Sequence, residues 1–195
     1  SIVADINASG ATIVTLQEIG RRTQDVVDGL RDDYPTQLLC PFAGVGGVAV
    51  LSTFGEVPGT RDCVDRTGMA SLVLNTPNGP VRAASIHLHW PFPFDQRAQV
   101  TNMLPRLKEW AEPTVIGGDF NMVPWSWAVR SIARETETDL VGPARITLRN
   151  KRLFLSISID HVMVSGGQGR TELRPQAGSD HFGVLARVSP VRLRP

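Results

Sequence analysis

Gly117-Gly118-Asp119-Phe120-Asn121 follows the apolar pair Val115-Ile116, which predicts the end of a buried strand that opens into a loop. Asp119 and Asn121 are two residues apart, so their side chains can point the same way if the backbone stays extended. The glycines would let the chain bend and let a phosphate or metal approach the backbone closely. A carboxylate and a carboxamide together offer hard oxygen ligands, which suit Mg²⁺. The alternative is an Asx-type turn, in which both side chains only hydrogen-bond nearby backbone.

The composition bounds the class of protein. With 195 residues, 42% of them hydrophobic, the chain reads as one domain, 1–195, with a substantial core. A formal net charge of +1 gives no general attraction to polyanions, so any such site must be local. No run of about 18 apolar residues is present, and the sequence opens without a signal-peptide pattern. Cys40 and Cys63 lack metal-site spacing; they could form a disulfide or remain buried thiols.

Hydrophobic periodicity predicts the elements of the first half of the chain. The expected elements are a helix over 1–8 stopped at Gly10, a strand over 11–16 buried on both faces, a helix over 23–33 and a strand over 48–52. The segments 69–75 and 81–88 flank Thr76-Pro77-Asn78-Gly79-Pro80, which predicts a β-hairpin. On its second strand, His87 and His89 should share one face.

The second half alternates helices with strands. A helix capped by Asp95, a helix after Ser126, a strand over 157–164 and a strand over 182–188 are expected. The hairpin excludes a purely parallel sheet. We therefore predict an α/β fold, a two-sheet mixed β-sandwich with helices outside, in four layers α/β/β/α.

Polar groups that carry chemistry gather where the predicted strands end. This set contains all four histidines, three aspartates, one glutamate and one asparagine: His87, His89, His161, His181, Asp119, Asp160, Asp180, Glu18 and Asn121. Chance would place some of them on helices. Ligands collected at the edge of a rigid sheet are typical of a catalytic cleft.

Five spaced blocks resemble the endonuclease/exonuclease/phosphatase superfamily, over residues 11–188. They are Leu16-Gln17-Glu18, His87-Leu88, Gly118-Asp119-Phe120-Asn121, Ile159-Asp160-His161 and Ser179-Asp180-His181. The loop Pro91-Phe92-Pro93 and the segment from Asn121 to Trp125 further resemble uncharacterised bacterial members, some of which carry membrane segments before this domain. The resemblance implies a Mg²⁺-dependent hydrolase, with Mn²⁺ as a possible substitute.

The same resemblance implies a role for each matching residue. Glu18 would be the main metal ligand, and Asp119 would orient or deprotonate the attacking water. Asn121 would hold a phosphate oxygen. His181 would contact the scissile phosphate as a base or a charged stabiliser, with Asp160 fixing its ring.

Further roles are less directly implied. Asp180 would be a carboxylate on the metal side, and His87 would bind the phosphate or assist the leaving group. His89 and His161 match no general family residue, so packing or hydrogen bonding is expected for both. The aromatic residues beside these blocks could stack on a base, meet a lipid tail or pack the rim; they are Trp90, Phe92, Phe94, Trp125 and Trp127. Trp90 and Trp125 are candidates for substrate contact.

The family begins with a strand that carries an asparagine near the metal, whereas this sequence begins inside the helix that follows. We expect that first strand to be absent from the chain as given. Two locations therefore stay open: a soluble domain in the cytoplasm, or an extracytoplasmic or membrane-anchored part of a longer precursor. A basic segment with Arg145, Arg149, Lys151 and Arg152 is either a solvated face or a phosphate-binding one.

The predicted function is hydrolysis of a phosphodiester or phosphomonoester by in-line attack of an activated water. One alternative is a DNA endonuclease or exonuclease, which should show a broader basic surface than a net charge of +1 provides. A calcineurin-like phosphatase would need a Gly-Asn-His block, which the sequence lacks. The non-enzymatic alternative is an inactive phosphate-binding module. A phosphate ester, with nucleic acid as one possibility, is the expected partner of a monomeric chain.

Overall fold

The computed structural model describes residues 1–21, 23–42, 44–64, 67–150 and 155–191. A six-stranded mixed sheet forms its centre, in the order β4-β5-β6-β7-β11-β8. The strand bounds are β4 Asp62–Val64, β5 Met69–Thr76, β6 Gly79–His87, β7 Thr114–Asp119, β8 Thr138–Leu140 and β11 Asp160–Ser165. The β6–β7 pair is parallel and the other pairs are antiparallel, so the sheet is mixed as predicted.

A smaller antiparallel sheet packs face to face on this one, in the order β1-β3-β2. Its strands are β1 Ile13–Ile19, β2 Thr36–Cys40 and β3 Gly47–Ser52. Two further antiparallel pairs complete the β structure: β9 Leu148–Asn150 with β10 Leu155–Ile157, and β12 Gly169–Arg174 with β13 Gly183–Val188.

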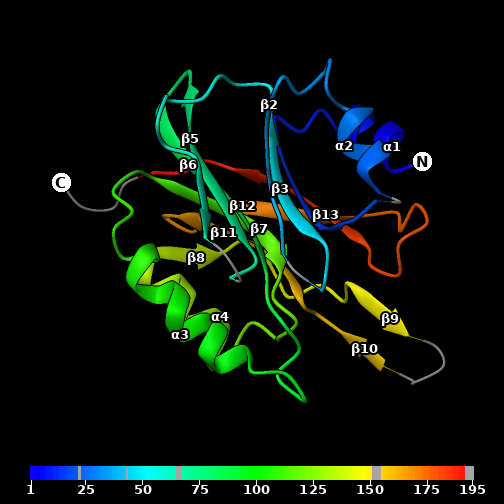
Figure 1. The fold of residues 1–195 in the computed structure, drawn as a ribbon, viewed down its shortest axis with the longest axis vertical. Coiled ribbons are helices and arrows are strands. Elements are labelled where there is room, and N and C mark those ends of the chain that lie inside the picture. The colour runs from blue at the N-terminus through cyan, green and yellow to red at the C-terminus, as the bar shows by residue number, and fades with distance from the viewer. Residues whose placement is uncertain (22, 43, 65–66, 151–154, 192–195) are drawn as a thin grey trace.

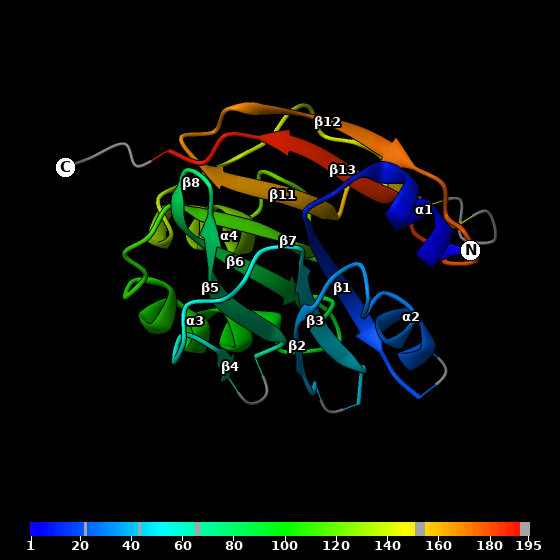
Figure 2. The same cartoon turned by 90° about the horizontal axis from the view of Figure 1, so that it is seen from above.

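Helices cover the outer faces of the two sheets, as Figures 1 and 2 show. The helices are α1 Ile2–Ser9, α2 Gln24–Asp28, α3 Gln96–Leu107 and α4 Trp127–Glu135. Val27 and Leu30 pack with Leu51 on the smaller sheet, while Val100 and Ile132 join the core under the large sheet. A third cluster, which includes Val50 and Leu72, fills the space between the sheets. The expected four-layer sandwich is therefore confirmed.

Several local expectations hold. Ser1 caps α1 and Gly10 ends it in the left-handed region, at φ 66°. The Asp95 side chain accepts from the Ala98 amide at 3.1 Å, which caps α3. The β5–β6 hairpin forms with Thr76 paired to Gly79, so only Pro77 and Asn78 link the strands.

Three expected elements have different bounds. The strand expected over 11–16 runs over Ile13–Ile19 at the edge of its sheet, and only Val14 and Ile19 in it are buried, so it is not buried on both faces. The helix expected over 23–33 ends at Asp28 and continues as turns, although Leu30 is still fully buried.

The strand expected over 157–164 is split between β10 and β11. The Thr147 hydroxyl accepts from the amides of Ile159 (3.2 Å) and Asp160 (3.1 Å), so a side chain replaces strand pairing at the break. The second hairpin strand ends at His87, so His89 lies beyond it, although both rings pack against Phe42.

The two glycines of the opening stretch serve a purpose that the sequence did not suggest. Both lie inside β7. A Cβ on Gly118 would lie 2.0 Å from the Ile86 carbonyl oxygen, and one on Gly117 would lie 2.5 Å from Thr15 Oγ1. They permit close packing on β6 and β1 rather than a bend.

A disulfide joins Cys40 at the end of β2 to Cys63 in β4, with a Cα–Cα distance of 5.4 Å. It therefore ties the smaller sheet to the large one. No helix in the described parts of the chain is long and apolar enough to cross a membrane.

Candidate active site

Strand register brings three of the predicted residues into one row. The parallel pairing of β6 and β7 sets His87 beside Asp119, and the antiparallel pairing of β7 and β11 sets Asp119 beside Asp160. Residues paired across neighbouring strands direct their side chains to the same face. One group from each of three adjacent strands therefore meets at the end of the large sheet.

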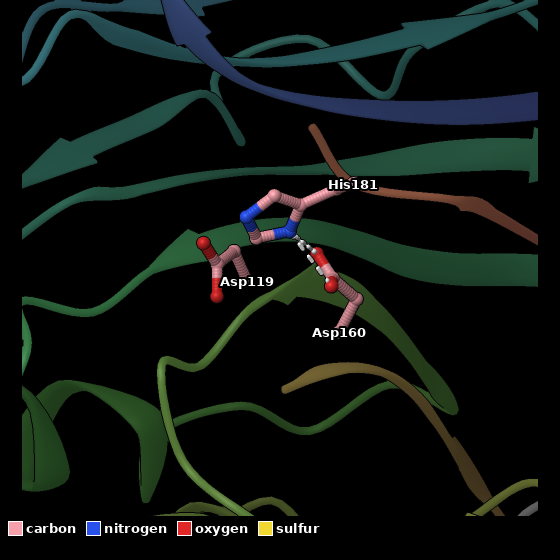
Figure 3. A group of neighbouring side chains, drawn as sticks. All are labelled: Asp119, Asp160 and His181. Carbon is pink, nitrogen blue, oxygen red and sulfur yellow. Dashed lines mark hydrogen bonds and ion pairs between the residues drawn. The ribbon is translucent and has the colours of Figure 1, made fainter. Parts of the chain in front are cut away.

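His181 reaches this row from the segment between β12 and β13, where a bridge to Leu148 holds its backbone. Its Nδ1 lies 2.9 Å from Asp160 Oδ2 and 3.2 Å from Oδ1. Figure 3 shows the ring next to both carboxylates, and candidate ligand atoms of Asp119, Asp160 and His181 lie within 4.8 Å of one another. Burial lowers the pKa of His181, but the hydrogen bond and charge of Asp160, with Asp119, raise it to about 9. The ring is therefore an imidazolium at neutral pH.

Asp119 is nearly inaccessible to solvent. Its Oδ1 accepts from the Asn121 amide at 2.8 Å, while its Oδ2 lies 3.7 Å from His87 Nε2. Burial raises the pKa of this carboxyl to about 7; the charges of Asp160 and Glu18 add to the rise, and His181 opposes it. Asp119 is thus able to accept a proton near neutral pH.

Asn121 adopts a left-handed backbone, at φ 48°. Its Nδ2 donates to the Leu88 carbonyl at 2.7 Å, and its Oδ1 is buried without a hydrogen-bond partner. Because the Leu88 carbonyl requires a donor, the amide orientation is fixed and the free atom is an acceptor. Such an oxygen accepts from a water or ligates a cation, and it offers no donor to a phosphate oxygen. The Asx-type turn is therefore present, because the Asp119 side chain accepts from the Asn121 amide. The Asn121 Oδ1 nevertheless stays available to a ligand.

His87 is 2% exposed, and its Nε2 lies 3.9 Å from Glu18 Oε1 as well as 3.7 Å from Asp119 Oδ2. Burial, followed by the charges of His89 and His181, lowers the pKa of His87 to about 4. The ring is therefore neutral, and these separations are longer than hydrogen bonds. These two approaches are therefore not ion pairs.

Glu18 lies at the bulge near the end of β1 and has a left-handed backbone, at φ 57°. Its side chain is 67% exposed, so it stands at the rim of the row. Gly46 packs directly on its backbone: a Cβ there would lie 2.8 Å from the Glu18 carbonyl carbon. The loop before β3 therefore packs against the backbone of Glu18 and not against its carboxylate.

Other predicted residues lie farther out. Asp180 is exposed and lies outside the group formed by Asp119, Asp160 and His181, although its charge adds to the rise in the pKa of His181. Trp90 is 37% exposed and Trp125 is 64% exposed, on the loops that follow β6 and β7. As expected, His89 stacks on Phe42 and His161 Nε2 hydrogen-bonds the Met122 carbonyl.

The side chains present fit a hard cation. Glu18 would offer a carboxylate oxygen to the cation, and the Asp119 carboxylate and the unpartnered Oδ1 of Asn121 would offer further oxygens to it or to a water. Such a donor set suits Mg²⁺ or Mn²⁺. His181 is a poor ligand because its ring is charged and already donates to Asp160.

Two structural contributors gave no signal in the sequence. Thr147 fixes the backbone at Asp160 through its hydroxyl. Phe42 packs against the rings of both His87 and His89. Each acts through tertiary contacts far along the chain, which periodicity and motif spacing do not reveal.

Comparison with protein families gives a match to the endonuclease/exonuclease/phosphatase family over residues 1–181. A comparison with curated proteins gives no match. Among solved structures, a sphingomyelinase C from Streptomyces griseocarneus is similar, with 17% identity, coverage of 94% of this chain and 90% of that one, and a TM-score of 0.65.

Two further structures share the fold. Truncated TDP2 from Caenorhabditis elegans has 16% identity over 95% of this chain and 87% of that one, with a TM-score of 0.71. A beta toxin variant from Staphylococcus aureus, whose structure holds bound magnesium ions, has 13% identity over 96% of this chain and 92% of that one, with a TM-score of 0.67.

Proposed function

The chain belongs to the endonuclease/exonuclease/phosphatase family and is therefore a metal-dependent phosphoesterase; from this premise we propose that it is a Mg²⁺-dependent hydrolase that cleaves a phosphodiester or phosphomonoester by in-line attack of water. The observation that carries the proposal is the row His87–Asp119–Asp160, set by strand register and completed by His181. It supplies a base, a neutral donor and a charged donor within one small region.

Asp119 is the candidate base. Its carboxyl, with a pKa raised to about 7 by burial, can take a proton from a water held next to it. The free Oδ1 of Asn121 can accept that water's second hydrogen, which would orient it. These two residues would thus align and activate the nucleophile.

His181 is the candidate charged stabiliser. Its Nδ1 is held by Asp160, so its protonated Nε2 is free to donate to a phosphate oxygen as charge develops. His87, which is neutral, can donate from one ring nitrogen to a second phosphate oxygen or to the leaving group. Of the two roles predicted for His181, the charged stabiliser is therefore favoured over the base.

A divalent cation, held by Glu18, would supply positive charge against the phosphate oxygens. Asp180, as a metal-side carboxylate, remains a prediction that the exposed position of the residue does not favour. Trp90 and Trp125 remain candidates for contact with the rest of the substrate.

The disulfide bears on the compartment. Stable disulfides are rare in reducing compartments of most cells, so Cys40–Cys63 favours an extracytoplasmic location among the alternatives left open by the sequence. Alkylation of thiols in freshly lysed cells, before and after reduction, would test this: an unmodified pair before reduction is expected.

Hydrolysis of bis(p-nitrophenyl) phosphate with Mg²⁺, Mn²⁺ or EDTA tests the function. We expect metal-dependent turnover that Asp119→Asn and His181→Gln each lower at least about a hundredfold, because a positioned acid or base contributes roughly 10²–10⁴ in rate. Glu109→Gln is the matched control, because Glu109 is an exposed carboxylate just after α3. Parent-like rates in both variants, or full activity in EDTA, would overturn the proposal.

A further inference from the structure

Two glutamines on helix α3 are buried although their side chains are polar: Gln96 is 5% exposed and Gln99 is 6% exposed. Neither belongs to the row of groups proposed for catalysis. Both side chains bond to the backbone at the ends of β6 and β7, where the strand pairing stops and the loops of the site begin. A buried amide needs partners for its N–H groups and its oxygen, so these partners show what each glutamine holds.

Gln99 binds the backbone around His87. Its Nε2 donates to the His87 carbonyl at 3.0 Å and to the Thr67 carbonyl at 2.8 Å, and its Oε1 accepts from the His89 amide at 2.8 Å. The carbonyl of Gly68, the residue after Thr67, accepts from the His87 amide at 2.8 Å. The backbone of His87 is therefore fixed through its amide by Gly68 and through its carbonyl by Gln99.

Gln96 joins the two loops that leave the sheet. Its Nε2 donates to the His89 carbonyl, and also to the Phe120 carbonyl at 3.2 Å. Two carbonyls cannot bond each other, so a group with two donors is needed between them, and an amide nitrogen provides both. Phe120 lies between Asp119 and Asn121, so this bridge holds the backbone next to both of those groups.

With the two glutamines in place, every backbone donor and acceptor from His87 to His89 has a partner. The Leu88 amide donates to the Asp119 carbonyl at 2.9 Å, and the Leu88 carbonyl accepts from Asn121 Nδ2 at 2.7 Å. Loss of either glutamine amide would leave buried backbone groups unpartnered, and the segment would shift to reach water. The Asn121 side chain would shift with it, because the Leu88 carbonyl fixes its orientation.

The His87 ring depends on its backbone for its position. Among the described residues its Nδ1 has no hydrogen-bond partner, and its Nε2 lies 3.7 Å from Asp119 Oδ2 and 3.9 Å from Glu18 Oε1. Both separations are longer than a hydrogen bond. The ring is therefore held by its packing on Phe42 and by the bonds of its backbone. A displacement of about 1 Å at a reacting group can lower a rate roughly a hundredfold.

We propose that Gln96 and Gln99 are positioning residues for the hydrolysis. Acting through the backbone, they keep the His87 ring and the Asn121 Oδ1 in place beside the Asp119 carboxylate. The proposal rests on the proposed function, because it assigns these amides to the alignment of groups that carry out that reaction.

Amide hydrogen exchange tests the contacts without catalysis. We expect Gln99→Met to speed exchange of the His89 amide at least about tenfold, because its acceptor is lost. Gln96→Met should speed exchange of the Phe120 amide, because the bridge between the loops is removed. Gln37→Met is the matched control, since the Gln37 Nε2 also donates to a backbone carbonyl but lies in the smaller sheet.

A double-mutant cycle tests the positioning role. With saturating bis(p-nitrophenyl) phosphate and Mg²⁺, and per mole of folded protein, we expect Gln99→Met to lower kcat at least about tenfold and to change KM less than about threefold. Because Gln99 acts through His87, adding Gln99→Met to His87→Ala should lower kcat by less than about twofold more. A general loss of structure would lower kcat equally in both backgrounds. Gln37→Met should keep the kcat of the parent.

A second cycle applies if Gln99→Met folds poorly. Gln96→Met is compared in the parent and in an Asn121→Ala background, and its effect on kcat should largely vanish in the second.

The outcomes separate the two proposals. Unchanged exchange at His89 and Phe120, or equal fractional losses of kcat in both backgrounds, would overturn the positioning role even if hydrolysis is vigorous. No hydrolysis by the parent, together with faster exchange at His89 in Gln99→Met, would refute the proposed function while supporting the contacts through which the glutamines fix these loops.

Discussion

Asp119 is held where an ionised carboxylate is unfavourable. It is buried, and Asp160 and Glu18 add negative charge nearby, so its pKa rises from 3.8 to about 7. Between these values the folded state binds more protons than the unfolded chain, and stability falls as pH rises through that window. The Asp119 carboxyl, whose raised pKa suits a general base, therefore destabilises the metal-free protein.

We predict that Asp119→Asn stabilises the metal-free protein at high pH. Each pKa unit corresponds to about 1.4 kcal/mol, so the rise from 3.8 to about 7 gives an expected gain of about 4 kcal/mol near pH 8 and a small one near pH 4. Urea unfolding in EDTA at both pH values measures the difference, with Glu109→Gln as control. A gain of equal size at both pH values would show that charge burial is not its cause.

At the scale of elements, the close contact of β6 with β7 sets the site. Gly118 leaves no room for a Cβ beside the Ile86 carbonyl. Since His87 and Asp119 directly follow these two residues in the paired strands, any separation there moves both functional groups.

We predict that Gly118→Ala destabilises the fold by about 2 kcal/mol or more, the size of a typical overpacking effect, and lowers the activity of the remaining folded protein. Gly55→Ala is the matched control, because nothing lies within 4 Å of a Cβ there. Unfolding midpoints and initial rates measure the two effects. A Gly118→Ala variant as stable as Gly55→Ala would argue against this packing.

Elements with strong local signals could be predicted, and those that depend on distant partners could not. The β5–β6 hairpin, the capped helix α3 and the end of β7 follow from turn residues, caps and periodicity. The partial burial of β1 depends on its place at the edge of the smaller sheet, which local sequence does not reveal. The break before Asp160 depends on Thr147, whose hydroxyl is recruited from another loop.

At the scale of the whole molecule, the Cys40–Cys63 disulfide links the two sheets across 23 residues of sequence. Spacing alone could not decide this pairing, because it requires β2 and β4 to meet. We predict that reduction lowers the free energy of unfolding by about 3 kcal/mol, from the loop that the bond closes. Urea unfolding with and without reductant tests this, and a Cys40→Ala, Cys63→Ala variant should be insensitive to reductant. Identical curves for the oxidised and reduced parent would contradict it.

The candidate site could be predicted as a set of residues but not as a geometry. Motif resemblance identified Glu18, His87, Asp119, Asn121, Asp160 and His181. It did not indicate that burial would lower the pKa of His87 or that the Asn121 Oδ1 would be buried without a hydrogen-bond partner. Those properties arise from burial and from contacts between loops distant in sequence.

The pairing of three strands through His87, Asp119 and Asp160 makes activity depend on correct strand register. A strand that slips by one residue turns all its side chains to the opposite face, so a misassembled copy would lack part of the row. Turnover would therefore require correct pairing of all three strands, and a molecule with a shifted strand would not cleave phosphate esters.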